Sequence, residues 1–142
     1  LSLRDACQGI APRDRFEIGF SGLGAFPDPA SPRVVWMGVD DPSGGLAALS
    51  ARLAAALSDK GIPPDLKPWK PHLTIGRVRS GRGRRGPVLE RGAGHSFGTE
   101  SVARVIFYRS TLDPRGAIHE PKWEVKIGRD RGPHPSLPPQ SG

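Results

Sequence analysis

A histidine and a threonine two residues apart, His72 and Thr74, are the residues of this sequence best suited to chemistry. An imidazole can accept and release a proton near neutral pH, and a threonine hydroxyl can hold a phosphoryl oxygen by a hydrogen bond. On a strand the two side chains share one face, because successive side chains alternate. The pair therefore suits acid–base chemistry at a phosphate group.

The residues before His72 predict that it enters a strand. Pro68 and Pro71 each disfavour helical backbone in the residue before them. We therefore expect a strand from His72 to Val78, with Leu73 and Ile75 buried on the face opposite the histidine. A histidine on a strand is more often packed or solvated than catalytic, so the spacing alone leaves both interpretations open.

Several segments resemble one family in the right order. Residues 71–77, Pro-His-Leu-Thr-Ile-Gly-Arg, resemble the second His-x-Thr-x motif of the two-histidine (2H) phosphoesterases, most closely their RNA 2',3'-cyclic phosphodiesterase (LigT/ThpR-like) branch. Residues 22–27 and 33–39 resemble the branch's Gly-Ala-Phe-Pro loop and the strand after it, and residues 110–116 resemble its C-terminal turn. The resemblance extends over roughly residues 1–128.

The resemblance implies an α+β fold, in which an antiparallel, concave sheet carries helices on its outer side. It implies that His72 and Thr74 are catalytic and that Arg77, three residues beyond the threonine, binds the phosphate or nucleotide. Strict alternation places Arg77 on the face opposite His72. A glycine inside a strand often marks a bulge, so Gly76 offers a way to return Arg77 to the histidine's face. Arg77 is therefore a candidate for binding only.

The implied reaction is hydrolysis of a 2',3'-cyclic phosphate at an RNA end to a 2'-phosphate, with two imidazoles as acid and base. No acidic cluster or histidine pair has the spacing of metal ligands, so we expect neither a metal nor a cofactor. The expected partner is RNA with a cyclic-phosphate end, with tRNA fragments among the candidates. Two alternatives stay open: a non-catalytic RNA-binding relative, and a phosphodiesterase acting on small cyclic nucleotides.

Members of the family carry two His-x-Thr-x motifs, and this sequence contains one. Neither His95, His119 nor His134 is followed two residues later by threonine. We expect the first motif upstream of Leu1, within a strand–helix–strand segment on the order of 40 residues. The fold would then be two-lobed and incomplete here, and the complete protein is expected to be a monomer.

Composition indicates one domain and a cytoplasmic protein. The chain has 142 residues, of which 36% are hydrophobic, enough for a modest core. It has one cysteine, Cys7. No charged-then-apolar pattern typical of a leader and no apolar run long enough to span a membrane is visible in these residues, so we expect neither secretion nor membrane insertion. We expect a phosphoesterase-like domain over residues 1–129 and a proline-rich, disordered tail over residues 130–142.

The net charge of +7 is concentrated beside His72. Lys67 to Arg91 contain eight basic residues and one acid, which leaves 13 of each sign elsewhere. A basic patch of this kind favours a polyanion such as RNA and predicts salt-dependent binding. The segment 80–86, Ser-Gly-Arg-Gly-Arg-Arg-Gly, is equally compatible with a solvated loop.

The remaining elements follow from periodicity and turn residues. The expected helices cover residues 1–11, with Leu3, Cys7 and Ile10 on one face, and a segment with Asp41 as its N-cap, Pro42 at its first position, four leucines on one face and Gly61 at its end. The expected strands are residues 15–21, 33–40, 101–109 and 123–127. Residues 22–32 and 81–98 are expected to be loops.

Two aromatic residues have alternative interpretations. The strand at 33–40 is rich in valine, so we expect it to be buried on both faces and Trp36 to be in the core. Phe26 could stack on a nucleobase, but we expect it, as an aromatic residue of a loop, to fold back onto the core.

Overall fold

The computed structural model describes residues 2–63, 65–79 and 86–128 of the chain. The arginine-rich segment 80–85 and the expected tail 130–142 lie outside these residues. Within them the chain forms three helices and six strands. In chain order they are α1 (Leu3–Ile10), β1 (Phe16–Phe26), β2 (Val34–Asp40), α2 (Gly45–Ser58), β3 (His72–Arg77), α3 (Gly86–Gly92), β4 (Ser96–Val102), β5 (Arg104–Asp113) and β6 (Gly116–Lys126).

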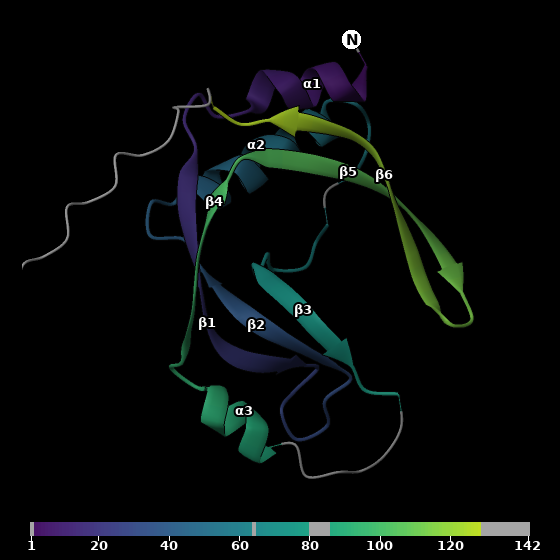
Figure 1. Ribbon diagram of the computed structural model, residues 1–142. Coiled ribbons are helices and arrows are strands. Elements are labelled where there is room, and N and C mark those ends of the chain that lie inside the picture. The colour runs from purple at the N-terminus through teal and green to yellow at the C-terminus, as the bar shows by residue number, and fades with distance from the viewer. Residues whose placement is uncertain (1, 64, 80–85, 129–142) are drawn as a thin grey trace, which may run out of the picture.

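The strands form two antiparallel sheets that follow one another along the chain. The larger sheet has the order β3-β2-β1-β4, and β5 pairs with β6 in the smaller one. Only Ala103 separates β4 from β5, so this stretch of chain bends from one sheet into the other (Figure 1). The predicted α+β fold with a concave antiparallel sheet is confirmed.

Helices α2 and α3 pack on β1, from the same face of the four-stranded sheet. A Cβ atom at Gly45, the first residue of α2, would lie 2.5 Å from the ring of Phe16, and one at Gly92 of α3 would overlap the side chain of Leu23. The ladder places Phe16 and Leu23 on the same face. Helix α1 packs on α2 and on β6. The other face of the sheet is turned away from α2 and α3 (Figure 1).

The core is small and lies on the helix side. Buried apolar side chains come from α1, β1, α2, α3, β6 and the residue after β6, namely Cys7, Ala25, Leu49, Leu89, Val125 and Ile127. Burial raises the pKa of the Cys7 thiol, as expected for a packed rather than a reactive cysteine. The predicted helix near the start of the chain is confirmed, and Ser2 and Asp5 close its first turn as a capping box.

The prediction that residues 22–32 form a loop is wrong for its first half. Strand β1 continues to Phe26, because Gly22 adopts a φ of 65° and forms a bulge between Ser21 and Leu23. The ladder with β2 then resumes. Glycine-rich sequence indicated a loop, but these glycines serve a bulge and a close contact within a strand.

The segment after β3 also differs from the prediction. A loop was expected over residues 81–98, whereas α3 occupies Gly86–Gly92 and β4 begins at Ser96. The last two strands are longer than their apolar cores predicted, because the hairpin continues through polar residues to the turn at Asp113–Gly116. Cross-strand pairing therefore extends these strands beyond the hydrophobic pattern.

Candidate active site

His72 begins β3, the edge strand of the larger sheet. It pairs with Gly38 of β2, and Thr74 pairs with Trp36. Residues directly opposite in an antiparallel pair have side chains on the same face, so His72 and Thr74 share the face that is turned away from the helices. This agrees with the alternation expected from the sequence.

The other face of β3 is more exposed than predicted. Leu73 and Ile75 were expected to be buried there, but they are 47% and 51% exposed. An edge strand has one neighbour only, and within the described residues no helix packs on β3. The alternation of apolar residues therefore predicts that Leu73 lies on the face opposite His72, but it does not predict that the side chain is buried there.

A bulge brings Arg77 to the face of His72. Thr74 pairs with Trp36 and Gly76 with Val35, so Ile75 is an extra residue in the ladder. Arg77 then pairs with Val34. Because β2 is regular here, its alternate residues 38, 36 and 34 share one face, and so do their partners His72, Thr74 and Arg77. The three predicted site residues thus lie in successive rows of one face.

The proton position on the His72 ring is fixed by the backbone. Nδ1 lies 2.7 Å from the carbonyl oxygen of Lys70. A carbonyl can only accept a hydrogen bond, so Nδ1 carries a proton and donates it. Nε2 is then the ring nitrogen that can exchange a proton with a substrate, and the side chain is exposed to solvent.

Two aromatic rings lie beside His72, and sequence reasoning did not place them there. The rings of His72 and Phe26 form a T-shaped pair, with centroids 5.1 Å apart and an interplanar angle of 85°. The centroids of the His72 and Trp36 rings are 6.3 Å apart. Trp36 was predicted to be core, but it is partly exposed on the open face. The expectation that β2 is buried on both faces is wrong, because its residues 34–39 are only partly buried on either face and, within the described residues, no helix packs on β2.

Polar and cationic groups complete the surroundings. Ser21 of β1 lies opposite Gly38, in the row of His72, and its hydroxyl donates to Asp40. The ammonium of Lys70 is 4.4 Å from the centroid of Trp36. Beyond β3, Arg79 donates to the carbonyl oxygen of Arg115 at 2.8 Å, which links this end of the sheet to the turn of the β5–β6 hairpin.

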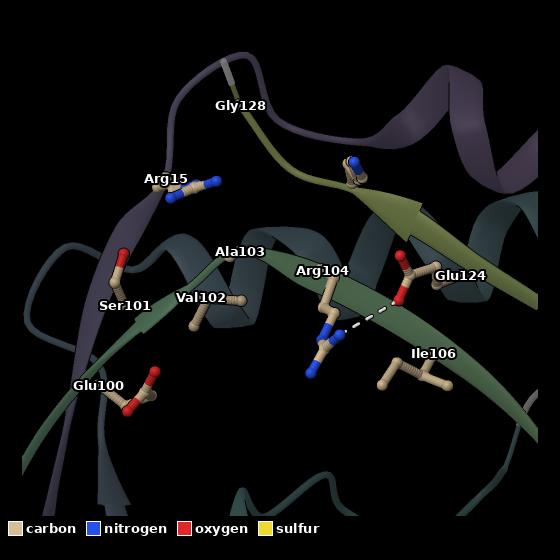
Figure 2. A pocket seen from close by; sticks show the side chains of 10 residues that line it. Arg15, Glu100, Ser101, Val102, Ala103, Arg104, Ile106, Glu124 and Gly128 are labelled. Atoms are coloured by element: carbon tan, nitrogen blue, oxygen red, sulfur yellow. Dashed lines mark hydrogen bonds and ion pairs between the residues drawn. The ribbon is translucent and has the colours of Figure 1, made fainter. Parts of the chain in front are cut away.

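A cavity of about 720 Å³ lies elsewhere, where β4 passes into β5. Figure 2 shows Arg104 of β5 and Glu124 of β6 joined by an ion pair beside Ile106. None of the predicted site residues lines this cavity. It has no histidine, so the acid–base chemistry is better assigned to the face of β3.

The described residues show neither a metal cluster nor a membrane-spanning helix. Over residues 2–63, 65–79 and 86–128, no group of three or more His, Cys, Asp or Glu side chains could hold a metal ion. In the same ranges, no helix has the length and apolarity needed to cross a membrane.

Comparison with known proteins agrees with this fold and motif. A sequence profile described as the 2'-5' RNA ligase superfamily matches residues 2–85. RNA 2',3'-cyclic phosphodiesterase of Archaeoglobus fulgidus is 38% identical over 105 residues, covering 74% of this chain and 58% of that protein. The enzyme of the same name from Aeropyrum pernix is 35% identical over 115 residues, covering 80% of this chain and 65% of its own length.

Solved structures share the fold at lower identity. A Thermus thermophilus protein, TT0787, matches with a TM-score of 0.65 and 24% identity, over 90% of this chain and 69% of that one. Escherichia coli LigT complexed with 3'-AMP matches with a TM-score of 0.66 and 19% identity, over 89% and 67%.

The chain belongs to the 2'-5' RNA ligase superfamily, the two-histidine phosphoesterases. Curated relatives that resemble this chain, among them those of Archaeoglobus fulgidus, Aeropyrum pernix and Aquifex aeolicus, are named RNA 2',3'-cyclic phosphodiesterase. The chain spans about three fifths of the length of these relatives, between 58% and 65%.

Proposed function

We propose that this chain carries one half of the catalytic centre of an enzyme that hydrolyses 2',3'-cyclic phosphate at an RNA end. The observation that carries the proposal is the grouping of His72, Thr74 and Arg77 on one open face, with the His72 proton held on Nδ1 by a backbone carbonyl. The names of the curated relatives support the same reaction.

In the proposed reaction a water oxygen attacks phosphorus, the bond from phosphorus to the 3'-oxygen breaks, and the phosphate stays on the 2'-oxygen. A base takes a proton from the water, and an acid gives one to the 3'-oxygen. Nε2 of His72 performs one of these transfers, as a base when unprotonated or as an acid in the imidazolium. The family resemblance assigns the other transfer to the histidine of a further His-x-Thr-x motif.

The neighbouring polar groups act on the charge that develops at phosphorus. The Thr74 hydroxyl donates to a non-bridging oxygen, and the Arg77 guanidinium pairs with the phosphate. Thr74 lies in the row next to that of His72 on the same face of the sheet, and Arg77 lies one row beyond Thr74, so both side chains lie on the side from which His72 acts. Arg77 binds substrate in this scheme and transfers no proton.

The test is turnover of a short RNA that ends in a 2',3'-cyclic phosphate, with the product identified by ³¹P NMR as a 2'-phosphate. In the protein at its full natural length, His72→Ala should lower kcat roughly 10²- to 10⁴-fold, the usual contribution of positioned proton transfer. Thr74→Val should have a milder effect. RNA affinity should change little, because His72 is one contact among many.

His95→Ala is the matched control, since His95 lies in the turn before β4 and makes a ring contact with Phe97. It should keep the parent rate. Turnover of His72→Ala close to that of the parent would contradict the catalytic assignment. Binding of the RNA without turnover by the unmodified protein would instead favour a non-catalytic RNA-binding protein.

A phosphodiesterase for small cyclic nucleotides is the second candidate. The observation in its favour is that E. coli LigT, which shares this fold, has a crystal structure in complex with 3'-AMP, a mononucleotide. A series of substrates from a mononucleotide to an RNA of about ten nucleotides distinguishes the two, measured at several salt concentrations. An RNA enzyme should bind longer substrates more tightly, with a salt slope that grows with length, because more phosphates are neutralised.

A further inference from the structure

Phe26 and Trp36 form an aromatic cluster on the same face of the sheet as His72. Their ring centroids are 5.2 Å apart, and each ring also contacts the imidazole. In the ladder, Trp36 lies in the row of Thr74, and Phe26 lies in the row of Arg77. The cluster therefore adjoins all three residues of the candidate site.

The cluster is not explained by the core. Helices α2 and α3 pack on the opposite face of the sheet, and both aromatic residues remain partly exposed. Trp36 lies flat on β1, because a Cβ atom at Gly24 would overlap its ring. Its indole nitrogen is buried without a hydrogen-bond partner among the described residues. The side chain therefore offers the outer face of its ring rather than its N–H group.

Lys70 supplies a cation at the rim of the cluster. Its ammonium is 4.4 Å from the Trp36 centroid and 5.9 Å from that of Phe26. A cation over an aromatic face that is open to water is held weakly, so another planar group can replace it. Lys70 lies two residues before His72, and its flexible stem lets the displaced ammonium reach a phosphate held beside the imidazole.

We propose that the aromatic cluster is the subsite for the nucleobase of the nucleotide that carries the cyclic phosphate. The base stacks on Phe26 and the outer face of Trp36, and the Lys70 ammonium moves from the ring to the phosphate. The contact between the Lys70 ammonium and the Trp36 ring is lost, and two contacts with the substrate replace it: the base stacks on the rings, and the ammonium pairs with the phosphate. Aromatic side chains on an open sheet face are a common platform for bases in RNA-binding proteins.

This inference rests on the proposed function and predicts a dependence on the base. The probes are adenosine 2',3'-cyclic phosphate and methyl ribofuranoside 2',3'-cyclic phosphate, which has the same reacting group and no base. In the protein at its full natural length, kcat/KM for the nucleotide should exceed that for the base-free substrate by about 5-fold or more, the lower end of aromatic–base stacking. Phe26→Leu should lower this ratio toward one, because it removes one of the two rings on which the base stacks.

Phe107→Leu is the matched control for the same chemical change. Phe107 stacks on Trp123 in the β5–β6 hairpin, with ring centroids 4.8 Å apart, and so lies in the other sheet. It should leave the ratio at the parent value. An equal kcat/KM for both substrates in the parent, or a ratio unchanged by Phe26→Leu, would overturn the subsite.

A binding measurement separates this inference from the proposed function. Calorimetric titration with 2'-AMP and with ribose 5-phosphate reports the base contact without any turnover. If the parent hydrolyses neither these two compounds nor an RNA that ends in a 2',3'-cyclic phosphate, the proposed function fails. Tighter binding of 2'-AMP that is lost in Phe26→Leu would still support the base subsite, and equal binding of both compounds would overturn it.

Discussion

At the scale of single residues, Gly24 decides where the indole of Trp36 lies. The ring occupies the space that a side chain at Gly24 would need. Gly24→Ala should therefore force the indole away from β1. Such overpacking typically costs about 1–3 kcal/mol of stability. Thermal unfolding measures the cost, and a change in Trp fluorescence should report the displaced ring.

Gly9→Ala is the control for this substitution. Gly9 lies in α1 with no atom within 4 Å of an added Cβ, and alanine is a better helix former than glycine. Its stability should be unchanged or higher. If Gly24→Ala proved equally harmless, the indole would not be seated on Gly24, and the base subsite would need another platform.

At the scale of elements, the side chain that caps α2 lies further upstream of the first helical residue than expected. The sequence predicted Asp41 as the N-cap, but the helix begins at Gly45 after a left-handed Gly44. The Asp41 carboxylate nevertheless accepts hydrogen bonds from the amides of Leu46 and Ala47, at 3.1 and 2.8 Å. The predicted function of the side chain was correct, and the predicted helix boundary was wrong by several residues.

Asp41→Ala should therefore destabilise the protein as the loss of a cap does, by about 0.5–2 kcal/mol. Urea denaturation of both proteins measures the difference. Asp59→Ala is the matched control, because Asp59 is at the C-terminal end of α2, where a negative charge opposes the helix dipole. It should be neutral or slightly stabilising. A loss of stability at Asp59 equal to that at Asp41 would contradict the capping role.

The sequence predicted elements whose pattern is local and missed those set by contacts between strands. Prolines before His72 and the leucine face of α2 were sufficient to predict β3 and the helix. The continuation of β1 beyond Gly22 depends on pairing with β2, which is distant in sequence, so the glycines there indicated a loop. Local pattern therefore identifies an element better than it identifies where the element ends.

In the candidate site too, the features set by local sequence pattern were predicted, and those set by pairing between strands were not. The shared face of His72 and Thr74 was predictable from alternation. The return of Arg77 to that face required a bulge, which Gly76 suggested and which the extra residue Ile75 provides. Trp36 and Lys70 could not be placed beside His72, because their positions depend on the register of β2 against β3.

At the scale of the whole molecule, apolar side chains are exposed on the hairpin and on the edge of the larger sheet. Leu112 is 90% exposed and Ile118 is 56% exposed, and Leu73 lies on the unpaired edge strand. Unpaired strand edges with apolar side chains favour association between chains. Residues 1–142 alone should therefore associate as concentration rises, which sedimentation velocity over a concentration series would detect.

The last prediction concerns catalysis by these 142 residues alone. The sequence holds one His-x-Thr-x motif, and the chain spans about three fifths of the length of its curated relatives. Groups that act as a unit do not leave half of the activity behind when one is missing. We therefore expect residues 1–142 to hydrolyse an RNA 2',3'-cyclic phosphate at least ~100-fold more slowly than a version extended upstream through a second His-x-Thr-x motif.

One assay at equal concentration of folded protein compares the two versions, because association of the shorter one would otherwise lower its apparent rate. Extension should raise kcat, since it supplies the second proton transfer, while the base preference should be the same in both. His95 and His119 are the alternative sources of that proton, and Nδ1 of His119 lies 2.8 Å from the Ser110 hydroxyl on the hairpin. Equal rates of the two versions would contradict the assignment of this chain as one half of a two-histidine centre, and a loss of rate in His95→Ala or His119→Ala of the shorter version would identify the residue that supplies the second proton.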